Sequence, residues 1–147
     1  MAQSFAMTRA EREAFLREPH IAVLSLNDPG HGPLAAPVWY DVEESGDVFF
    51  LTSGHSRKGR LIVLETRLTL TVQSETAPYR YVSIEGPVTA LDSYDADHDL
   101  KAMATRYRGA EAAAEFVAAR RDALPHENPL RVTMCPERWL TTDYAKR

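Results

Sequence analysis

Residues 67–74 have the sequence Arg67-Leu-Thr-Leu-Thr-Val-Gln-Ser74, which carries the clearest structural signal in the chain. Leu68, Leu70 and Val72 alternate there with polar side chains. Because successive side chains of a strand point to opposite faces, this alternation predicts a β-strand with one buried face. Residues 80–91 alternate in the same way and predict a second strand.

Four more strands are expected around this pair, because short apolar or alternating segments are bounded there by turn-forming residues. These segments are residues 21–26, 34–42, 47–53 and 130–135. Pro37 interrupts the second of them. Since proline cannot donate to a strand ladder, it predicts a sheet edge or a bulge at that point.

Helices are expected beside the strands. A capping box at Thr8-Arg-Ala-Glu11 predicts the start of a helix that ends before Pro19. Further helices are expected at residues 56–65, 95–107 and 110–122. Six short strands linked mostly by hairpins, with a few helices, predict a mainly β, α+β fold, a six-stranded antiparallel barrel with flanking helices.

The composition limits the class of protein. The chain has 147 residues without an internal repeat or a linker, so we expect a single domain over residues 1–147. An apolar fraction of 44% and a charged fraction of 26% exclude disorder as the main state. The net charge of −4 argues against a nucleic-acid partner. A single cysteine, together with the lack of a signal-like start or a membrane-length apolar run, predicts a cytoplasmic protein with no membrane partner.

No catalytic constellation is recognisable from residue spacing. The five histidines lack metal-ligand spacing, so no metal site is expected, and no nucleophile elbow is present. Gly54 and Gly59 have the spacing of a phosphate-binding P-loop, but Arg60 and Leu61 replace its lysine and its hydroxyl residue. Nucleotide hydrolysis is therefore excluded, and an enzymatic role would depend on a cofactor for its chemistry.

The segment Thr52-Ser-Gly-His-Ser-Arg-Lys-Gly-Arg-Leu61 joins a strand to a helix start rich in cations. Backbone amides and the dipole at a helix start favour an anion. Arg57, Lys58 and Arg60, with nearby hydroxyls, could bind phosphate oxygens by charge-assisted hydrogen bonds. A solvated basic helix end explains the same residues equally well.

Two aromatic segments are further ligand-binding candidates. Pro37-Val-Trp-Tyr40 places two large rings beside the proline irregularity, where an aromatic ligand could stack, although ordinary core packing also explains both rings. Pro78-Tyr-Arg-Tyr81 adds a cation between two phenols, which suits an anionic ligand or, more readily, a dimer interface.

Taken in order, these segments resemble the flavin- and deazaflavin-binding split β-barrel family of pyridoxamine 5′-phosphate oxidase. The similarity is strongest to the branch assigned to the deazaflavin coenzyme F-420, and it covers most of the chain. Order and spacing together carry it, rather than one motif. The segments involved are Ile21–Leu26, Pro37–Tyr40, His55–Arg60, Arg67–Val72, Pro78–Gly86 and Pro136–Trp139.

The resemblance implies a split barrel that forms a homodimer, with two cofactor sites at the subunit interface. Residues implied to hold the cofactor phosphate are Ser56, Arg57, Lys58 and Arg60. Residues implied to bind near the ribityl chain or the phosphate are Thr52 and Ser53. Backbone implied to line the redox edge of the ring belongs to Pro37, Val38, Trp39 and Tyr40. Residues implied to come from around the dimer interface are Tyr79, Arg80 and Trp139.

The resemblance also implies a function, an oxidoreductase that uses coenzyme F-420 to transfer hydride to a small organic acceptor. FMN is the alternative cofactor, because both molecules carry phosphate anions suited to a basic helix start. An FMN-dependent pyridoxamine 5′-phosphate oxidase-like enzyme, and a non-catalytic protein that binds a flavin, a haem or a tetrapyrrole, are the alternative functions. Leu61 departs from the asparagine usual in the family and is consistent with a third alternative, a dimeric module that has lost the site.

Overall fold

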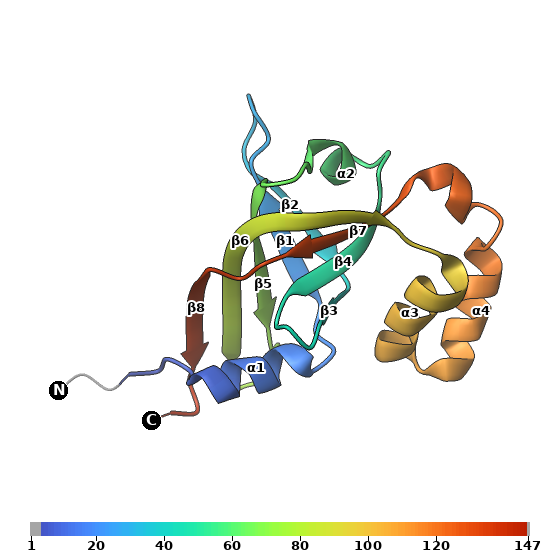
Figure 1. Cartoon of the computed structure of the whole chain (residues 1–147). Helices are drawn as coiled ribbons and strands as arrows, with labels where there is room; N and C mark the ends of the chain where they lie inside the picture. The colour runs from blue at the N-terminus through green and yellow to red at the C-terminus, as the bar shows by residue number, and fades with distance from the viewer. Residues whose placement is uncertain (1–3, 147) are drawn as a thin grey trace.

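The pair of strands with the strongest alternation forms the middle of the sheet. The computed structural model describes residues 4–146, and in it β5 (Arg67–Gln73) pairs antiparallel with β6 (Arg80–Ser93). Strand β6 has 14 residues and a register shift between Val88 and Ala90. It bends over the top of the sheet (Figure 1), so its first part pairs with β5 and β8 and its last part with β7.

The remaining strands extend this pair into a curled antiparallel sheet of eight strands. Their order is β2-β1-β5-β6-β7-β4-β3, with β8 paired to β6. Their bounds are β1 (Ala22–Leu26), β2 (Leu34–Val38), β3 (Tyr40–Val42), β4 (Val48–Ser53), β7 (Pro129–Met134) and β8 (Arg138–Asp143). The predicted antiparallel split barrel with flanking helices is confirmed, with eight strands in place of six.

The two additional strands have separate causes. The segment predicted as one strand over residues 34–42 breaks at Trp39 into β2 and β3, which lie at opposite ends of the strand order. The chain therefore crosses the split of the barrel at this residue. Pro37 lies in the edge strand β2, as predicted. Strand β8 was not expected, because residues 138–143 show no clear alternation and follow a proline.

Alternating apolar side chains fill the interior of the barrel. Leu24, Leu70 and Ile84 are register partners on β1, β5 and β6, and all three are buried. Burial of each such side chain stabilises the fold by about 1.5–3 kcal/mol. Helix α1 (Arg9–Arg17) covers one end of the barrel (Figure 1) and adds the buried side chains of Phe15 and Leu16. Its predicted capping box is present.

The other helices lie outside this core. Helix α2 (Arg57–Leu61) is shorter than the predicted helix 56–65, because Ile62 is extended and buried in the barrel core. The π-helix η1 (Ala96–Leu100) leads into α3 (Lys101–Arg108), and α4 (Ala110–Arg120) and the 3-10 helix η2 (Leu124–Glu127) follow. Helices α3 and α4 stand beside the sheet (Figure 1), and we call residues 96–127 the arm. None of the helices described in residues 4–146 could span a membrane.

Arg106 ties the arm to the barrel. Its guanidinium donates to the carbonyl oxygens of Leu16, Arg17 and Glu18 at the end of α1, over distances of 2.8–3.1 Å. It also donates to the carbonyl oxygen of Tyr40, at 2.9 Å. The Leu16 and Glu18 carbonyls also accept from the Tyr40 hydroxyl, and the Tyr40 carbonyl accepts from the Tyr107 hydroxyl. Arg106 adds a charged donor to these groups and so joins the end of α1 to the split of the sheet.

Candidate functional site

A cavity of about 660 Å³ lies between the split of the barrel and the arm. Both parts contribute side chains to its wall. The barrel side contributes residues that the sequence singled out: Pro37, Val38, Trp39, Thr52, Ser53 and Lys58. The arm side contributes residues that it did not: Leu100, Met103, Arg108, Phe116, Arg120 and Glu127, with Tyr94 just before the arm. The volume lies in the range of about 300–1,000 Å³ that is usual for small-molecule sites.

Lys58 reaches the cavity because α2 is packed tightly against the end of β4. Gly59 makes this approach possible, since a Cβ there would collide with the carbonyl oxygen of Ser53. Lys58 lines the cavity and forms no ion pair within residues 4–146. The short helix therefore delivers one uncompensated cation to the barrel end of the cavity.

The hydroxyl groups of the loop are already bonded to protein atoms. Ser56 caps α2 by accepting from the Gly59 N–H at 3.1 Å, and its hydroxyl donates to the Ser53 carbonyl at 2.6 Å. The Ser53 hydroxyl donates to the carbonyl of Glu127 at 2.6 Å. The free helix-start amides expected for phosphate are thus partly occupied, and Ser56 acts here as a helix cap. Thr52 is buried, and its hydroxyl lies 3.3 Å from that of Ser56.

The remaining cations of the loop point elsewhere. Arg57 pairs with the carboxylate of Asp28, whose side chain is 9% exposed, so its charge is compensated within the chain. Arg60 is exposed and does not line the cavity. Of the two sequence interpretations, a solvated basic helix end describes Arg60, whereas Lys58 fits a ligand site. Asp28 lies in the turn-rich segment 27–33, where nothing in the sequence indicates a buried carboxylate.

Tyr40 belongs to the core and not to the cavity wall. Its side chain is fully buried, and its hydroxyl donates to the Leu16 carbonyl at 2.7 Å. Burial raises the pKa of this phenol far above its usual value. Its backbone N–H and carbonyl are bonded by Tyr107 and Arg106. Of the segment predicted to line the cofactor ring, Pro37, Val38 and Trp39 line the cavity and Tyr40 does not.

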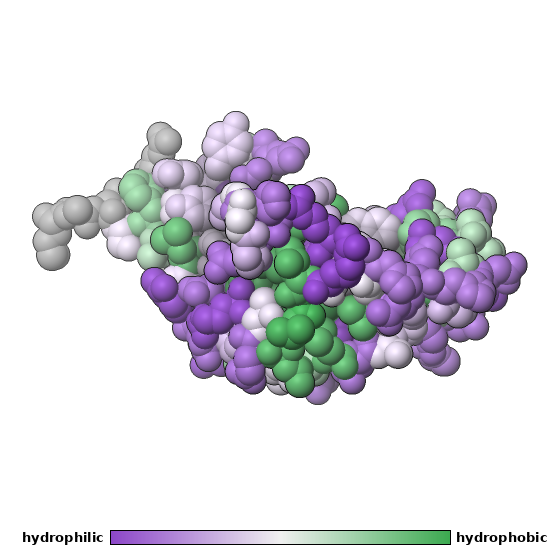
Figure 2. All heavy atoms as spheres, turned by 90° about the horizontal axis from the view of Figure 1, so that it is seen from above, coloured by the Kyte–Doolittle hydropathy of each residue, from purple (hydrophilic) through white to green (hydrophobic). Residues whose placement is uncertain are grey.

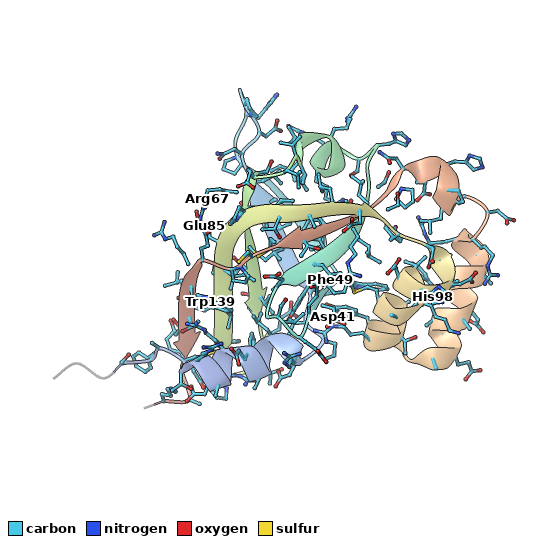
Figure 3. The ribbon with its side chains drawn as sticks, in the orientation of Figure 1. Asp41, Phe49, Arg67, Glu85, His98 and Trp139 are labelled. Atoms are coloured by element: carbon cyan, nitrogen blue, oxygen red, sulfur yellow. The ribbon has the colours of Figure 1, made fainter. Side chains whose placement is uncertain are left out.

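Three predicted residues lie away from this cavity. Arg80 is at the start of β6, with its guanidinium 4.8 Å from the Phe15 ring centroid, and exposed Tyr79 precedes it. Trp139 lies on β8, on the opposite side of the sheet from the arm (Figure 3), under the guanidinium of Arg12 at 4.0 Å. Their predicted approach across a dimer interface stays a prediction.

The arm side of the cavity is apolar and aromatic. Phe116 lies 5.7 Å from Trp39, measured between ring centroids, and Leu100 and Met103 are buried beside the cavity. Tyr94 also lines the wall, and burial raises the pKa of its phenol. Sequence reasoning missed this side because the alanine-rich stretch 110–120 shows little amphipathic pattern. The signal in the sequence that could have indicated this side was Phe116, an aromatic residue in a segment that also contains Arg108 and Arg120.

Charges on the arm are only partly paired. Arg120 binds Glu127 at 2.5 Å, whereas Arg108 forms no ion pair within the described residues. No group of three or more His, Cys, Asp or Glu side chains among residues 4–146 is arranged to hold a metal ion. The cavity is therefore a mainly apolar site with one uncompensated cation from each side.

Comparisons with known proteins give a family and a fold. The family model described as pyridoxamine 5′-phosphate oxidase matches residues 8–134. A conserved hypothetical protein from Mycobacterium tuberculosis is similar in structure, with a TM-score of 0.72, 20% identity, and coverage of 99% of this chain and 92% of that chain. No curated protein matches the chain.

Two further solved structures share the fold. An F-420 reductase has a TM-score of 0.61 and 18% identity, over 87% of this chain and 94% of that chain. An FAD- and haem-binding protein from Mycobacterium smegmatis has a TM-score of 0.66 and 18% identity, over 97% of this chain and 73% of that chain.

Proposed function

The chain belongs to the pyridoxamine 5′-phosphate oxidase family, and from this membership we propose that it is an oxidoreductase that binds coenzyme F-420 in the cavity between barrel and arm. The observation that carries the proposal is the meeting of Lys58 with Trp39 and Phe116 around one cavity. Bound there, the deazaflavin would supply hydride for a small organic acceptor.

The residues present fit such a cofactor. Lys58 would bind an anionic phosphate group, since its ammonium lines the cavity and forms no ion pair among the described residues. Trp39 offers an aromatic surface at the split of the barrel, beside backbone that the break between β2 and β3 leaves outside a regular ladder. The apolar arm side would exclude water from the reacting atoms.

The choice of F-420 needs a direct test, because solved structures with this fold include both an F-420 reductase and an FAD- and haem-binding protein. We would titrate the purified protein with F-420, FMN and haem under identical conditions. Saturable binding of F-420 with little binding of FMN or haem is the expected result. Tight FMN binding would identify a flavin enzyme instead, and binding without oxidation of the reduced cofactor in the presence of any acceptor would identify a carrier.

A homodimer is part of the same proposal. Val23 on β1 is 43% exposed, and Ile21, just before this strand, is 48% exposed and also lines the cavity, so exposed apolar surface continues to the cavity mouth. Tyr79 and Leu140 are 55% and 61% exposed. Seen from above, an apolar patch also interrupts the hydrophilic surface (Figure 2). A second copy covering β1 would bury apolar surface and could bring Tyr79 or Trp139 to its partner's cavity.

The oligomeric state can be tested by sedimentation velocity. The wild-type protein is expected to sediment as a dimer, and Val23→Glu is expected to shift it to the monomer while the far-ultraviolet circular dichroism stays unchanged. A monomeric wild-type protein that still binds cofactor would reject the dimer and leave the cofactor proposal standing.

A further inference from the structure

We propose that the arm side of the cavity binds the hydride acceptor, and that this acceptor is a planar conjugated carboxylate. The inference rests on the proposed function, because it assigns the barrel side of the same cavity to the cofactor. It adds a substrate class and a residue, Arg108, that would recognise the charge of the substrate.

The shape of the acceptor follows from the aromatic wall. Trp39 stacks on Tyr107, with 5.0 Å between ring centroids and 7° between ring planes, and Phe116 leans against Trp39 at 50°. Trp39 and Phe116 both line the cavity, beside the buried side chains of Leu100 and Met103. Flat aromatic faces backed by aliphatic side chains favour a flat, conjugated ligand, because stacking adds to apolar burial.

The charge of the acceptor follows from the pairing of the arginines. Arg120 is compensated by Glu127, at 2.5 Å. The Arg108 guanidinium lies 5.5 Å from the Phe116 ring centroid and forms no ion pair within residues 4–146. A cation held over an aromatic ring at the edge of an apolar cavity can receive a carboxylate while the body of the ligand stacks on the wall.

Two separate cations allow two anions to bind together. Lys58 comes from α2, at the top of the molecule in Figure 1, and Arg108 from the last turn of α3, which runs away from α2. A cofactor phosphate at Lys58 therefore leaves Arg108 available for a second anionic group. The cavity of about 660 Å³ extends between the two sides.

Calorimetric titration with 2-naphthoate and its neutral analogue 2-naphthamide tests the assignment. The wild-type protein should bind 2-naphthoate more tightly than 2-naphthamide by about fivefold, the upper range for an exposed charge pair. Arg108→Gln should remove that preference, while Arg108→Lys should retain part of it. Arg121→Gln is the matched control, because Arg121 lies on the arm, pairs with Asp97 and does not line the cavity.

Lys58→Ala separates the two sides of the cavity. It should weaken F-420 binding and leave 2-naphthoate binding unchanged. Loss of 2-naphthoate binding in Lys58→Ala but not in Arg108→Gln would place the anion on the barrel side and overturn the inference. Equal affinity for the acid and the amide, or no binding of either, would also overturn it. If F-420 fails to bind while 2-naphthoate keeps its dependence on Arg108, the proposed function fails and the acid-binding site stands.

Discussion

Trp39 and Tyr107 stack face to face, 5.0 Å between ring centroids, and their backbones belong to different parts of the molecule. Trp39 occupies the break between β2 and β3, and Tyr107 is on α3. The Tyr107 hydroxyl accepts from the Tyr40 N–H at 3.0 Å and donates to the His20 carbonyl at 2.7 Å. A side chain from the arm thus replaces sheet hydrogen bonds where the barrel is split, and it also holds one wall of the cavity.

Tyr107→Phe is expected to lower the free energy of unfolding by about 1–3 kcal/mol, because the Tyr40 N–H would lose its partner in a partly buried place. Tyr107→Leu should cost more, since it also removes the stacking with Trp39. Urea unfolding measures both. Tyr79→Phe, at an exposed position, serves as the control and should be neutral. Equal effects of Tyr107→Phe and Tyr79→Phe on stability would contradict the bridging role of the Tyr107 hydroxyl.

Arg106→Met is expected to destabilise the protein by about 3 kcal/mol, because several backbone carbonyls lose a charged donor. Arg106→Lys should recover only part of this, since an ammonium cannot reproduce the fork of the guanidinium. Hydrogen exchange should show loss of protection concentrated in α3. Arg121→Met removes a single exposed ion pair and should change stability by no more than about 1 kcal/mol. Unchanged protection in α3 would refute the tie between arm and barrel.

Lys58→Ala is expected to weaken F-420 binding by about tenfold or more, because a charge-assisted contact contributes about 1.5–3 kcal/mol. Fluorescence titration at fixed ionic strength measures the change. Arg60→Ala removes the same charge from the same short helix without touching the cavity wall, so it should change affinity little. Similar losses in both variants would mean that net charge, and not a contact at Lys58, attracts the cofactor.

Gly59→Ala is expected to cost about 1–3 kcal/mol of stability, because the new methyl group would displace α2 from the end of β4. Cofactor affinity should fall with it, since Lys58 moves with the helix. Gly32→Ala provides the comparison, because the space around that position is open. Thermal unfolding and titration of both variants check the prediction. A Gly59→Ala protein of normal stability and affinity would show that this close packing is dispensable.

Cys135 should react slowly with iodoacetamide near pH 8. Partial burial raises the pKa of its thiol, and the negative charge of nearby Asp47 raises it further. A raised pKa means less thiolate at a given pH, so the alkylation rate should rise only at higher pH than for an unperturbed thiol. Asp47→Asn removes the negative charge and should shift the rise of the alkylation rate to lower pH. Glu44→Gln, on the same turn, should leave the profile where it is.

The sequence predicted the strands in which buried and exposed side chains alternate. Alternation identified β5 and β6 because one face of each strand packs against the core. This pattern can be recognised without knowing which strand is the partner. The capping box identified the start of α1 for a similarly local reason. Pro37 predicted an irregularity close to the break at Trp39. The sequence pattern did not show that β2 and β3 lie at opposite ends of the sheet.

Part of the candidate site was also predictable from the sequence. Lys58 and Trp39 belong to motifs with a recognisable residue order, and both line the cavity. Arg57 belongs to the same motif, yet it pairs with Asp28, 29 positions earlier in the chain. Nothing in the local pattern distinguishes a cation that meets a ligand from one that meets a buried carboxylate.

The sequence by itself therefore determined most of the strands, the first helix and part of the barrel side of the cavity, because these depend on periodicity and short-range bonding. Tertiary structure alone decided the arm side of the site and its attachment. Arg106 meets the Leu16 carbonyl across 90 residues, and Phe116 meets Trp39 across the split of the barrel. Such contacts depend on how the curled sheet and the arm are placed in space, and a local pattern of side chains does not encode that placement.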